Sequence, residues 1–360
     1  MYIKTLKLDN FRNYIKQDIS FIKGINLFIG DNAQGKTNII EAIYLTAFAK
    51  SYRTNKDEEV INFENEYSRV KLEYNKKEIN DNIEIFIDNK GNKIIKKDDI
   101  KINKISSLIG EVLLVIFSPD DLDIVKGSPS SRRKFLDMIC CQISKSYMIC
   151  FQEYNKCLKL KNNILKRNIC KEDKEYIYVL HDKMSENIFK IVNFRKNILE
   201  KLLEKAKNIH LNITNNKENI DIEYISDFIN LDKNKIKEIL DNNLQIDIYR
   251  KTSTKGIQRD DLIIKINNFE VNKFGSQGQN RTALLTLKLA NFEVIKDIKN
   301  EIPILLLDDI MSELDSSRIK FLLKYIENYQ SVITTTEHIF ENKIKNIKIT
   351  KILNGHLQNE

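Results

Sequence analysis

The chain has 360 residues, and its 59 Lys and Arg against 51 Asp and Glu give a net charge of +8. Its 10 glycines and 3 prolines are few, because average usage is about 7% Gly and about 5% Pro. Neither residue occurs from 130 to 255, which excludes a turn-rich β-sandwich or propeller there and predicts long helices. The length predicts about two domains.

The sequence gives no sign of export or membrane insertion. Its longest apolar runs, such as 304–307, are far too short to span a bilayer, and its N-terminus lacks the unbroken apolar stretch of a signal peptide. The 5 cysteines are odd in number and lack the C-x-x-C spacing of metal sites. These features predict a reduced, cytoplasmic chain with no membrane partner.

The positive charge is concentrated in one segment. Residues 130–255 hold 25 Lys and Arg against 17 Asp and Glu, an excess of 8 that equals the excess of the whole chain. A surplus confined to one segment favours a polyanionic partner such as nucleic acid. A solvated helical surface in a lysine-rich protein is the alternative, and charge alone favours nucleic acid only slightly.

The N-terminal third is predicted to be mostly β-structure with one helix. Alternating apolar residues over 3–11 and the apolar run 25–29 predict two strands. Helical spacing over 38–49 follows a glycine-containing loop. Residues 60–117 alternate like further strands, with a hairpin turn at 89–92.

Helices are predicted for the middle of the chain. Apolar residues recur near heptad spacing over 151–165 and with a three-four rhythm over 177–202, broken only by Arg195. The polar stretch 166–175 predicts a turn between them. This pattern suits a short helical hairpin and a plain helical bundle equally well. Strand-like alternation resumes over 246–271.

The loop between the strand at 25–29 and the helix at 38–49 fits the phosphate-binding pattern G-x-x-x-x-G-K-[ST]. Its residues are Gly30, Asp31, Asn32, Ala33, Gln34, Gly35, Lys36 and Thr37. The glycines let backbone N–H groups face a phosphate beside the N-terminus of the next helix. Lys36 is predicted to reach the β- and γ-phosphates of ATP, and Thr37 to ligate Mg²⁺. The strand before and the helix after this Walker A loop argue against a mere turn.

An apolar strand at 304–307 ends in Asp308 and Asp309, the layout of a Walker B strand. Asp308 is predicted to hold Mg²⁺ through water. Asp309 is predicted to orient or deprotonate the attacking water. An apolar strand that ends in Asp is common by itself, but the Walker A loop favours the functional interpretation. Lys36, Asp308 and Asp309 are therefore the candidate catalytic residues, and Thr37 and Asp308 the candidate metal ligands.

A second glycine-containing turn precedes an apolar helix and is predicted to be another anion site. Its candidate residues are Ser276, Gln277, Gly278 and Gln279. One nucleotide does not need two such sites in the same subunit, so we expect this turn to serve ATP held by a second copy of the chain. An ordinary helix cap is the alternative.

These motifs resemble the ABC-type ATPases and, among their soluble DNA-handling members, the RecF family of bacterial DNA replication and repair proteins. The stretches that carry the resemblance are Asp9–Tyr14, Gly30–Ile43, Phe117–Asp137, Phe274–Thr282 and Leu305–Asp315. They occur in the family's order over nearly the whole chain.

The chain departs from the family at a few positions. Tyr52 and Gln258 stand where the family usually has histidines, so no histidine role is assigned at either place. Asp309 replaces the Glu of most ABC ATPases, which leaves its role as a base open. The switch histidine of transporters has no clear counterpart, and either Thr336 or His338 could take its place.

The resemblance implies an α/β fold: an ABC-type P-loop ATPase head with an inserted helical, short coiled-coil-like subdomain. On this basis 1–125 is the N-terminal part of the ATPase lobe and 126–245 the inserted helical lobe. Residues 246–360 are then the C-terminal part, with the signature turn and Walker B. By the same resemblance, Asp315 would lie in the loop that contacts a partner subunit.

The resemblance also implies weak, DNA-dependent ATP hydrolysis and a homodimer around two ATP molecules with Mg²⁺. The expected DNA partner is double-stranded DNA near single-strand gaps. The family works with RecO and RecR to load recombinase in recombinational repair, replication restart and the SOS response. An ATP-binding subunit of a transporter and another SMC- or Rad50-like ATPase are the alternatives, and a P-loop kinase or nuclease-fused ATPase is a weaker one.

Overall fold

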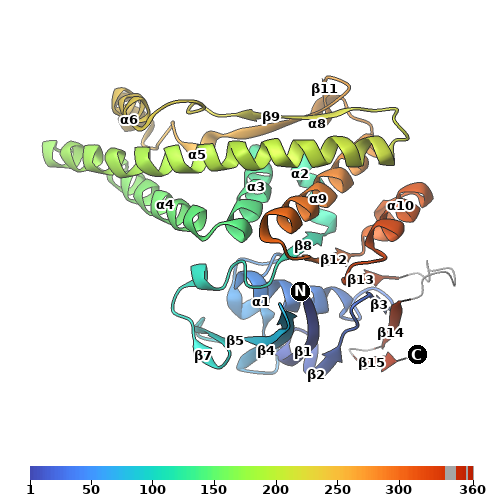
Figure 1. Ribbon diagram of the computed structural model, residues 1–360. Helices are drawn as coiled ribbons and strands as arrows, with labels where there is room; N and C mark the ends of the chain where they lie inside the picture. The colour runs from blue at the N-terminus through green and yellow to red at the C-terminus, as the bar shows by residue number, and fades with distance from the viewer. Residues whose placement is uncertain (337–345, 354–355, 360) are drawn as a thin grey trace. The chain divides into compact units, whose positions relative to one another are not determined.

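The computed structural model describes residues 1–336, 346–353 and 356–359. The chain divides into two compact units. Unit 1 comprises Met1–Asp121 with Asn291–Glu360, and unit 2 comprises Leu122–Ala290. Their elements are labelled in Figure 1.

The core of unit 1 is a sheet of six described strands in the order β15-β14-β3-β13-β12-β8. Its neighbours are parallel except for β15, which is antiparallel to β14. Every residue of β3, β12 and β13 is buried, as expected for short apolar strands covered on both faces. The strands are β3 (Ile25–Ile29), β8 (Leu114–Phe117), β12 (Ile304–Asp308), β13 (Ser331–Thr335), β14 (Ile347–Leu353) and β15 (His356–Asn359).

A second, antiparallel sheet of unit 1 has the order β2-β1-β4-β5-β6-β7. Alternation buries Ile3, Leu6 and Leu8 of β1 completely, and the predicted hairpin turn at 89–92 joins β5 to β6. The strands are β1 (Tyr2–Phe11), β2 (Tyr14–Ser20), β4 (Tyr67–Lys76), β5 (Ile79–Asp88), β6 (Lys93–Lys97) and β7 (Ile100–Lys101). Helix α1 (Lys36–Phe48) contacts strands of both sheets, and α10 (Ser316–Ile326) precedes β13.

Unit 2 is built on a helical hairpin. Helix α4 (Lys145–Leu165) and the 43-residue helix α5 (Lys171–Ile213) are joined by a short turn and lie against each other (Figure 1). Of the two arrangements that the sequence left open, the structure therefore has the hairpin. The other helices are α2 (Asp123–Lys126), α3 (Pro129–Ile143), α6 (Lys233–Asn242), α7 (Leu244–Arg250), α8 (Val271–Phe274) and α9 (Gln277–Lys299), which begins in unit 2.

Arg195, which interrupts the apolar rhythm of α5, is 1% exposed and pairs with two carboxylates. Its Nη2 donates to Asp137 Oδ1 and its Nη1 to Asp260 Oδ2, each at 2.7 Å. The hydroxyl of Tyr224 also donates to Asp260 at 2.6 Å. A buried guanidinium is tolerated because these partners compensate for its lost hydration. The break in the apolar pattern thus marks an ionic tie between α5, α3 and the segment after α7.

The strand expected over 246–271 is only partly present. Residues 244–250 form α7, because the buried residues Leu244 and Asp247 are three apart, which suits a helix rather than a strand. Strand β10 (Asp261–Ile266) is shorter than expected, and it lies between β9 (Ile220–Ile225) and β11 (Phe269–Glu270), antiparallel to both.

The compact units end at 121 and 290, whereas the lobes predicted from the sequence end at 125 and 245. The units are defined by compactness, whereas the lobes are defined by which residues belong to the ATPase head and which to its insertion. The lobe boundaries therefore stay a prediction. No helix in the described ranges is both long enough and apolar enough to cross a membrane.

Candidate nucleotide-binding site

The Walker A loop has the predicted surroundings, since β3 ends at Ile29 and α1 begins at Lys36. Gly35 has a φ of +104°, and a Cβ there would lie 2.4 Å from Asn13 Nδ2. A Cβ on Gly30 would lie 2.5 Å from the carbonyl oxygen of Ile352. Ala33 also has a positive φ, of 66°. Both motif glycines are thus required by close neighbours, and the left-handed residues curl the backbone as a phosphate-binding loop needs.

The Lys36 side chain lies within the loop and is 6% exposed. Its Nζ donates to the carbonyl oxygens of Gly30 and of Asp31, the latter at 2.9 Å. Burial lowers the pKa of Lys36, while nearby carboxylates, first of all that of Asp309, oppose the shift. The ammonium group is therefore held by weak neutral acceptors, which a phosphate oxygen would replace with a charged one.

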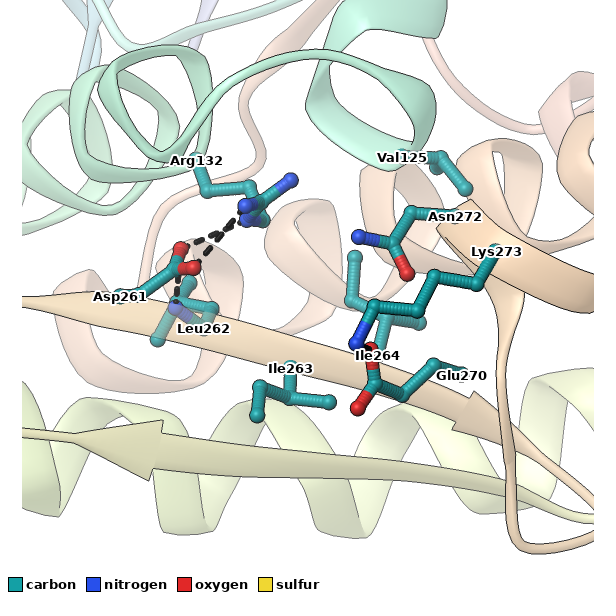
Figure 2. Close-up of a pocket in the computed structure, with 9 residues that line it drawn as sticks. All are labelled: Val125, Arg132, Asp261, Leu262, Ile263, Ile264, Glu270, Asn272 and Lys273. Atoms are coloured by element: carbon teal, nitrogen blue, oxygen red, sulfur yellow. Dashed lines mark hydrogen bonds and ion pairs between the residues drawn. The ribbon is translucent and has the colours of Figure 1, made fainter.

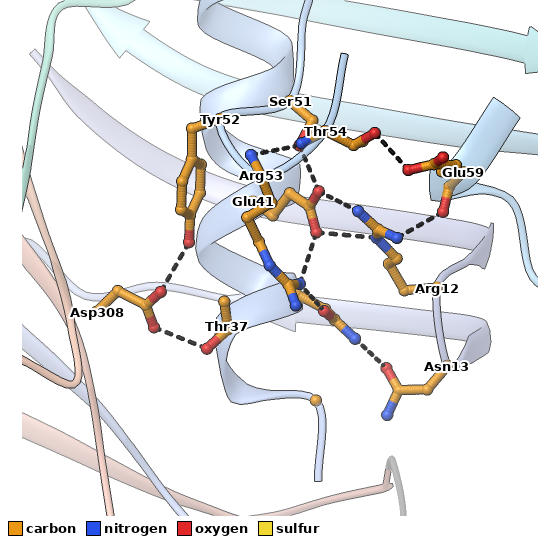
Figure 3. A network of polar contacts seen from close by, with 12 residues as sticks. Arg12, Asn13, Thr37, Glu41, Ser51, Tyr52, Arg53, Thr54, Glu59 and Asp308 are labelled. Atoms are coloured by element: carbon orange, nitrogen blue, oxygen red, sulfur yellow. Dashed lines mark hydrogen bonds and ion pairs between the residues drawn. The ribbon is translucent and has the colours of Figure 1, made fainter. Parts of the chain in front are cut away.

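Asp308 lies at the carboxyl end of β12 and is 4% exposed. Its Oδ1 accepts hydrogen bonds from Thr37 Oγ1 at 2.8 Å and from Thr334 Oγ1 at 2.9 Å. Its Oδ2 accepts one from the hydroxyl of Tyr52 at 2.8 Å, as Figure 3 shows for Tyr52 and Thr37. The structure thus brings together the two predicted metal ligands, Thr37 and Asp308, which are 271 positions apart.

Tyr52 is a site residue for which the sequence motifs predict no role, since the family usually has a histidine at this position. Burial, followed by the charge of Asp308, raises the pKa of Tyr52 far above its ordinary value. The phenol therefore stays protonated and acts as a fixed hydrogen-bond donor to the Walker B carboxylate. Thr334 was missed because a threonine in an apolar strand carries no signal of this kind.

Asp309 adopts a left-handed backbone with φ 51° directly after β12. Its N–H donates to the carbonyl oxygen of Thr334 at 3.2 Å and to Thr334 Oγ1 at 3.1 Å. These bonds fix the backbone at the point where the strand ends. The predicted role of Asp309 toward the attacking water stays a prediction.

Glu41 is a buried carboxylate on α1, one turn after Thr37, with no exposed surface. Arg12 donates to it through Nη2 at 2.6 Å and Nε at 3.0 Å. Arg53 donates at 3.0 Å and Ser51 Oγ at 2.5 Å. Figure 3 shows these side chains converging on Glu41. This network joins the β1–β2 turn and the segment after α1 to the helix that carries the loop, and a charged residue among the apolar residues of α1 was its only signal.

The turn between β1 and β2 also holds the Walker A loop directly. Asn13 Nδ2 donates to the carbonyl oxygen of Gln34 at 3.1 Å, and Asn13 Oδ1 accepts from Asn38 at 2.8 Å. The hydroxyl of Tyr14 donates to the carbonyl oxygen of Gly35 at 3.2 Å. The stretch Asp9–Tyr14 carries the family resemblance, but the sequence predicts no role for it. In the structure, Asn13 and Tyr14 of this stretch hold the phosphate-binding loop through hydrogen bonds.

The predicted signature turn lies in unit 2, at the N-terminus of α9. Ser276 and Gln277 are exposed, and Gly278 and Gln279 are partly exposed. Ser276 Oγ accepts from the N–H of Gln279 at 3.1 Å, so the turn is a capped helix start. The geometry is compatible with an anion site and with an ordinary cap, and the service of this turn to a second copy stays a prediction.

Three further positions from the sequence can be placed or set aside. Asp315 accepts from the N–H groups of Ser317 and Arg318 at 3.1 and 3.0 Å and caps α10. Thr336 follows β13 and is exposed. His338 lies outside the described residues, so the choice between it and Thr336 stays open.

A hollow of 190 Å³ in unit 2 lies beside β10 and α8. Figure 2 shows Arg132 and Asp261 directed at each other at one end of it. Arg132 donates to both carboxylate oxygens of Asp261, at 2.7 and 2.9 Å. Because Arg132 and Asp261 pair with each other, neither is free to bind a ligand in this hollow.

The comparisons with known proteins show the family of this chain. The family model for the RecF/RecN/SMC N terminal domain matches residues 2–358. A curated relative from Clostridium kluyveri, "DNA replication and repair protein RecF", is 46% identical over 338 residues, covering 93% of each chain. The chain belongs to the RecF family. It is thus a member of a family of DNA replication and repair proteins, and the resemblance seen in the motifs is confirmed.

Solved structures support the fold. The recombination mediator protein RecF with ATP, of the RecFOR pathway, has a TM-score of 0.91 and 36% identity, covering 100% of this chain and 97% of that one. An Smc head bound to the C-winged helix domain of ScpA has a TM-score of 0.58 at 16% identity, covering 99% and 96%, and shows the fold alone. The predicted α/β, ABC-type ATPase head with inserted helices is confirmed. Membership of this family gives no support to a transporter subunit.

Proposed function

We propose that the chain is an ATP-dependent DNA-binding protein of recombinational repair and replication restart, in which weak ATP hydrolysis switches a dimer on DNA. The observation that carries this proposal is the contact of Thr37 with Asp308 beside a glycine loop that encloses Lys36. A solved relative with 36% identity is described with ATP bound. This chain shares the fold of that relative.

The residues of unit 1 fit ATP with Mg²⁺. Hydroxyl and carboxylate oxygens are the ligands that Mg²⁺ prefers, and Thr37 and Asp308 supply them. Bound there, Mg²⁺ would neutralise charge on the β- and γ-phosphates. Lys36 would exchange the carbonyls of Gly30 and Asp31 for phosphate oxygens. Asp309, which follows the strand in a fixed backbone, would orient the attacking water or accept its proton.

The signature turn of unit 2 would complete the site of a second copy. Its exposed position leaves Ser276 accessible, and the N-terminus of the 23-residue helix α9 adds positive potential. Two such contacts would join two chains around two ATP molecules, and hydrolysis would release them.

The DNA-binding part of the proposal rests on charge. Unit 2 holds 31 Lys and Arg against 21 Asp and Glu, a net charge of +10, whereas the rest of the chain holds 28 against 30, a net charge of −2. A duplex would therefore be attracted to unit 2, with steep salt dependence. By family, the substrate would be double-stranded DNA near a gap in the cytoplasm, with RecR and RecO as partners in loading recombinase and in the SOS response.

Sedimentation with and without ATP and a gapped duplex tests the proposal. We expect the wild-type chain to be a monomer alone, to dimerise with ATP, and to bind the duplex more tightly as a dimer. Lys36→Arg should bind ATP but hydrolyse it poorly. Ser276→Arg should bind ATP without dimerising. Dimerisation of Ser276→Arg with ATP would refute the role of the signature turn, and a wild-type chain that stays monomeric with ATP would refute the dimer.

A further inference from the structure

The signature turn is closed by its own side chains on both sides. Ser276 Oγ accepts the N–H of Gln279 at 3.1 Å, and the N–H of Ser276 donates to Gln279 Oε1 at 3.0 Å. This reciprocal pair is a capping box. Because the Ser276 hydroxyl is used here as an acceptor, its own proton remains available to donate to an anion.

Glu218 fixes the orientation of the side-chain amide of Gln279. Gln279 Nε2 donates to Glu218 Oε1 at 2.8 Å. An amide whose nitrogen is held by a carboxylate must present its oxygen on the other side, and that oxygen is the acceptor for the Ser276 N–H. Glu218 therefore keeps the capping box closed from outside the turn.

Glu218 also lies against the C-terminal end of α5. Its Oε2 is 3.7 Å from Nε2 of His210, which is fully buried in the last turn of that helix. The Nδ1 of His210 is 3.0 Å from Thr286 Oγ1, on α9. Thr214 Oγ1 donates to the carbonyl oxygen of His210 at 2.8 Å and accepts from the N–H of Glu218 at 3.4 Å. The end of the longest described helix thus contacts α9 directly through His210 and Thr286, and it contacts the signature turn through the carboxylate of Glu218.

We propose that Glu218 is a positioning residue of the signature turn. It holds Gln279 so that Ser276 keeps the form that receives a γ-phosphate from a second copy, and it ties this form to the end of α5. The inference rests on the proposed function, because the turn acts only in a nucleotide-dependent dimer. No described contact of Glu218 reaches the Walker motifs, so its effect should be confined to the joining of two chains.

The charge of Glu218 makes the hypothesis specific. A carboxylate near an anion site disfavours phosphate binding, so its benefit must come from the hydrogen bond to Gln279 rather than from its charge. Glu218→Gln keeps an acceptor and removes the charge. Glu218→Ala removes both. The two variants should therefore behave differently, which a role in charge alone does not predict.

The test is the dissociation constant of the ATP-dependent dimer, measured by sedimentation, beside the ATP affinity of the monomer, measured with a fluorescent ATP analogue. Glu218→Ala should weaken the dimer about thirtyfold, because each of the two signature turns is then ordered only when the chains join, at a cost of about fivefold a turn. ATP affinity should not change. Glu218→Gln should dimerise as well as the wild type or better. Glu223→Ala is the matched control, since Glu223 is an exposed acid of the same unit that pairs with Lys265.

Each outcome decides between the two proposals. If the wild-type chain does not dimerise with ATP, the proposed function fails and not the role of Glu218 alone. If it dimerises and Glu218→Ala dimerises equally well, the role of Glu218 is refuted. Equal weakening in Glu218→Ala and Glu218→Gln, with an equal loss of thermal stability, would show a merely structural role. Glu218→Met keeps the length without the acceptor and repeats the test should the alanine variant not fold.

Discussion

The two glycine-containing turns of this chain are held in different ways. The Walker A loop is braced from several distant segments, through Asn13, Tyr14 and the buried Glu41 network, and its lysine is enclosed. The signature turn is exposed and is held by its own capping box and by Glu218. The difference agrees with their proposed roles. The site for the subunit's own nucleotide is held rigid, whereas the site for another subunit's nucleotide must be accessible.

The largest effect is expected at Asp308, which lies at the carboxyl end of β12 and contacts Thr37 of the Walker A loop. Asp308→Asn replaces the metal-binding carboxylate by a neutral amide, and we expect ATP hydrolysis to fall by about a hundredfold or more. Steady-state hydrolysis with Mg²⁺ in excess measures it. The intact signature turn should still serve a second copy, and hydrolysis near the wild-type rate would remove Asp308 from the site.

Breaking the buried Glu41 network should destabilise the surroundings of the Walker A loop and leave the signature turn unaffected. Glu41→Ala leaves Arg12 and Arg53 without their shared partner, although both can still reach water, since 21% and 41% of their side chains are exposed. We expect unit 1 to lose about 2 kcal/mol of stability. Thermal unfolding monitored by circular dichroism measures it. An unchanged midpoint would show that the network does not hold the loop, and Glu66→Ala, an exposed acid of the same unit, is the control.

Tyr52 tests whether the hydrogen bonds that hold Asp308 affect metal binding. Tyr52→Phe removes one hydrogen bond to a charged acceptor, worth about 1.5 kcal/mol, so half-maximal ATP hydrolysis should need about tenfold more Mg²⁺. Tyr52→His, which restores a donor, should recover most of the loss. A Mg²⁺ dependence that is identical in Tyr52→Phe and the wild type would refute a role at Asp308.

The smallest expected effect is a pH dependence of stability at His210, which lies beside Glu218 near the signature turn. Burial lowers the pKa of His210, with Glu218 opposing the shift, so the folded chain favours the neutral ring more than the unfolded chain does. This stability is present above the unfolded pKa of about 6.5 and is lost as pH falls below it, by at most about 1.4 kcal/mol per pH unit. His210→Gln should flatten the pH dependence of unfolding between pH 7 and 5. An unchanged profile would contradict a neutral buried His210.

The contiguous motifs were predictable because their chemistry is local. Gly30–Thr37 needs only a strand before it and a helix after it, and the Walker B acids need only the end of an apolar strand. Tyr52, Thr334 and Glu41 were not predictable, because each acts through a partner that the fold brings from elsewhere in the chain. In unit 2, α7 was mistaken for a strand because its isoleucines alternate, although the residues that it buries are three apart.

The central claim is that each ATP is shared by two chains, and a mixing experiment tests it most directly. Lys36→Arg has an intact signature turn and an impaired Walker A loop, whereas Ser276→Arg has the reverse. One of the two sites in a mixed dimer therefore combines two intact halves. The account predicts that an equal mixture hydrolyses ATP faster than either variant alone. A mixture no more active than the average of the two variants would contradict it.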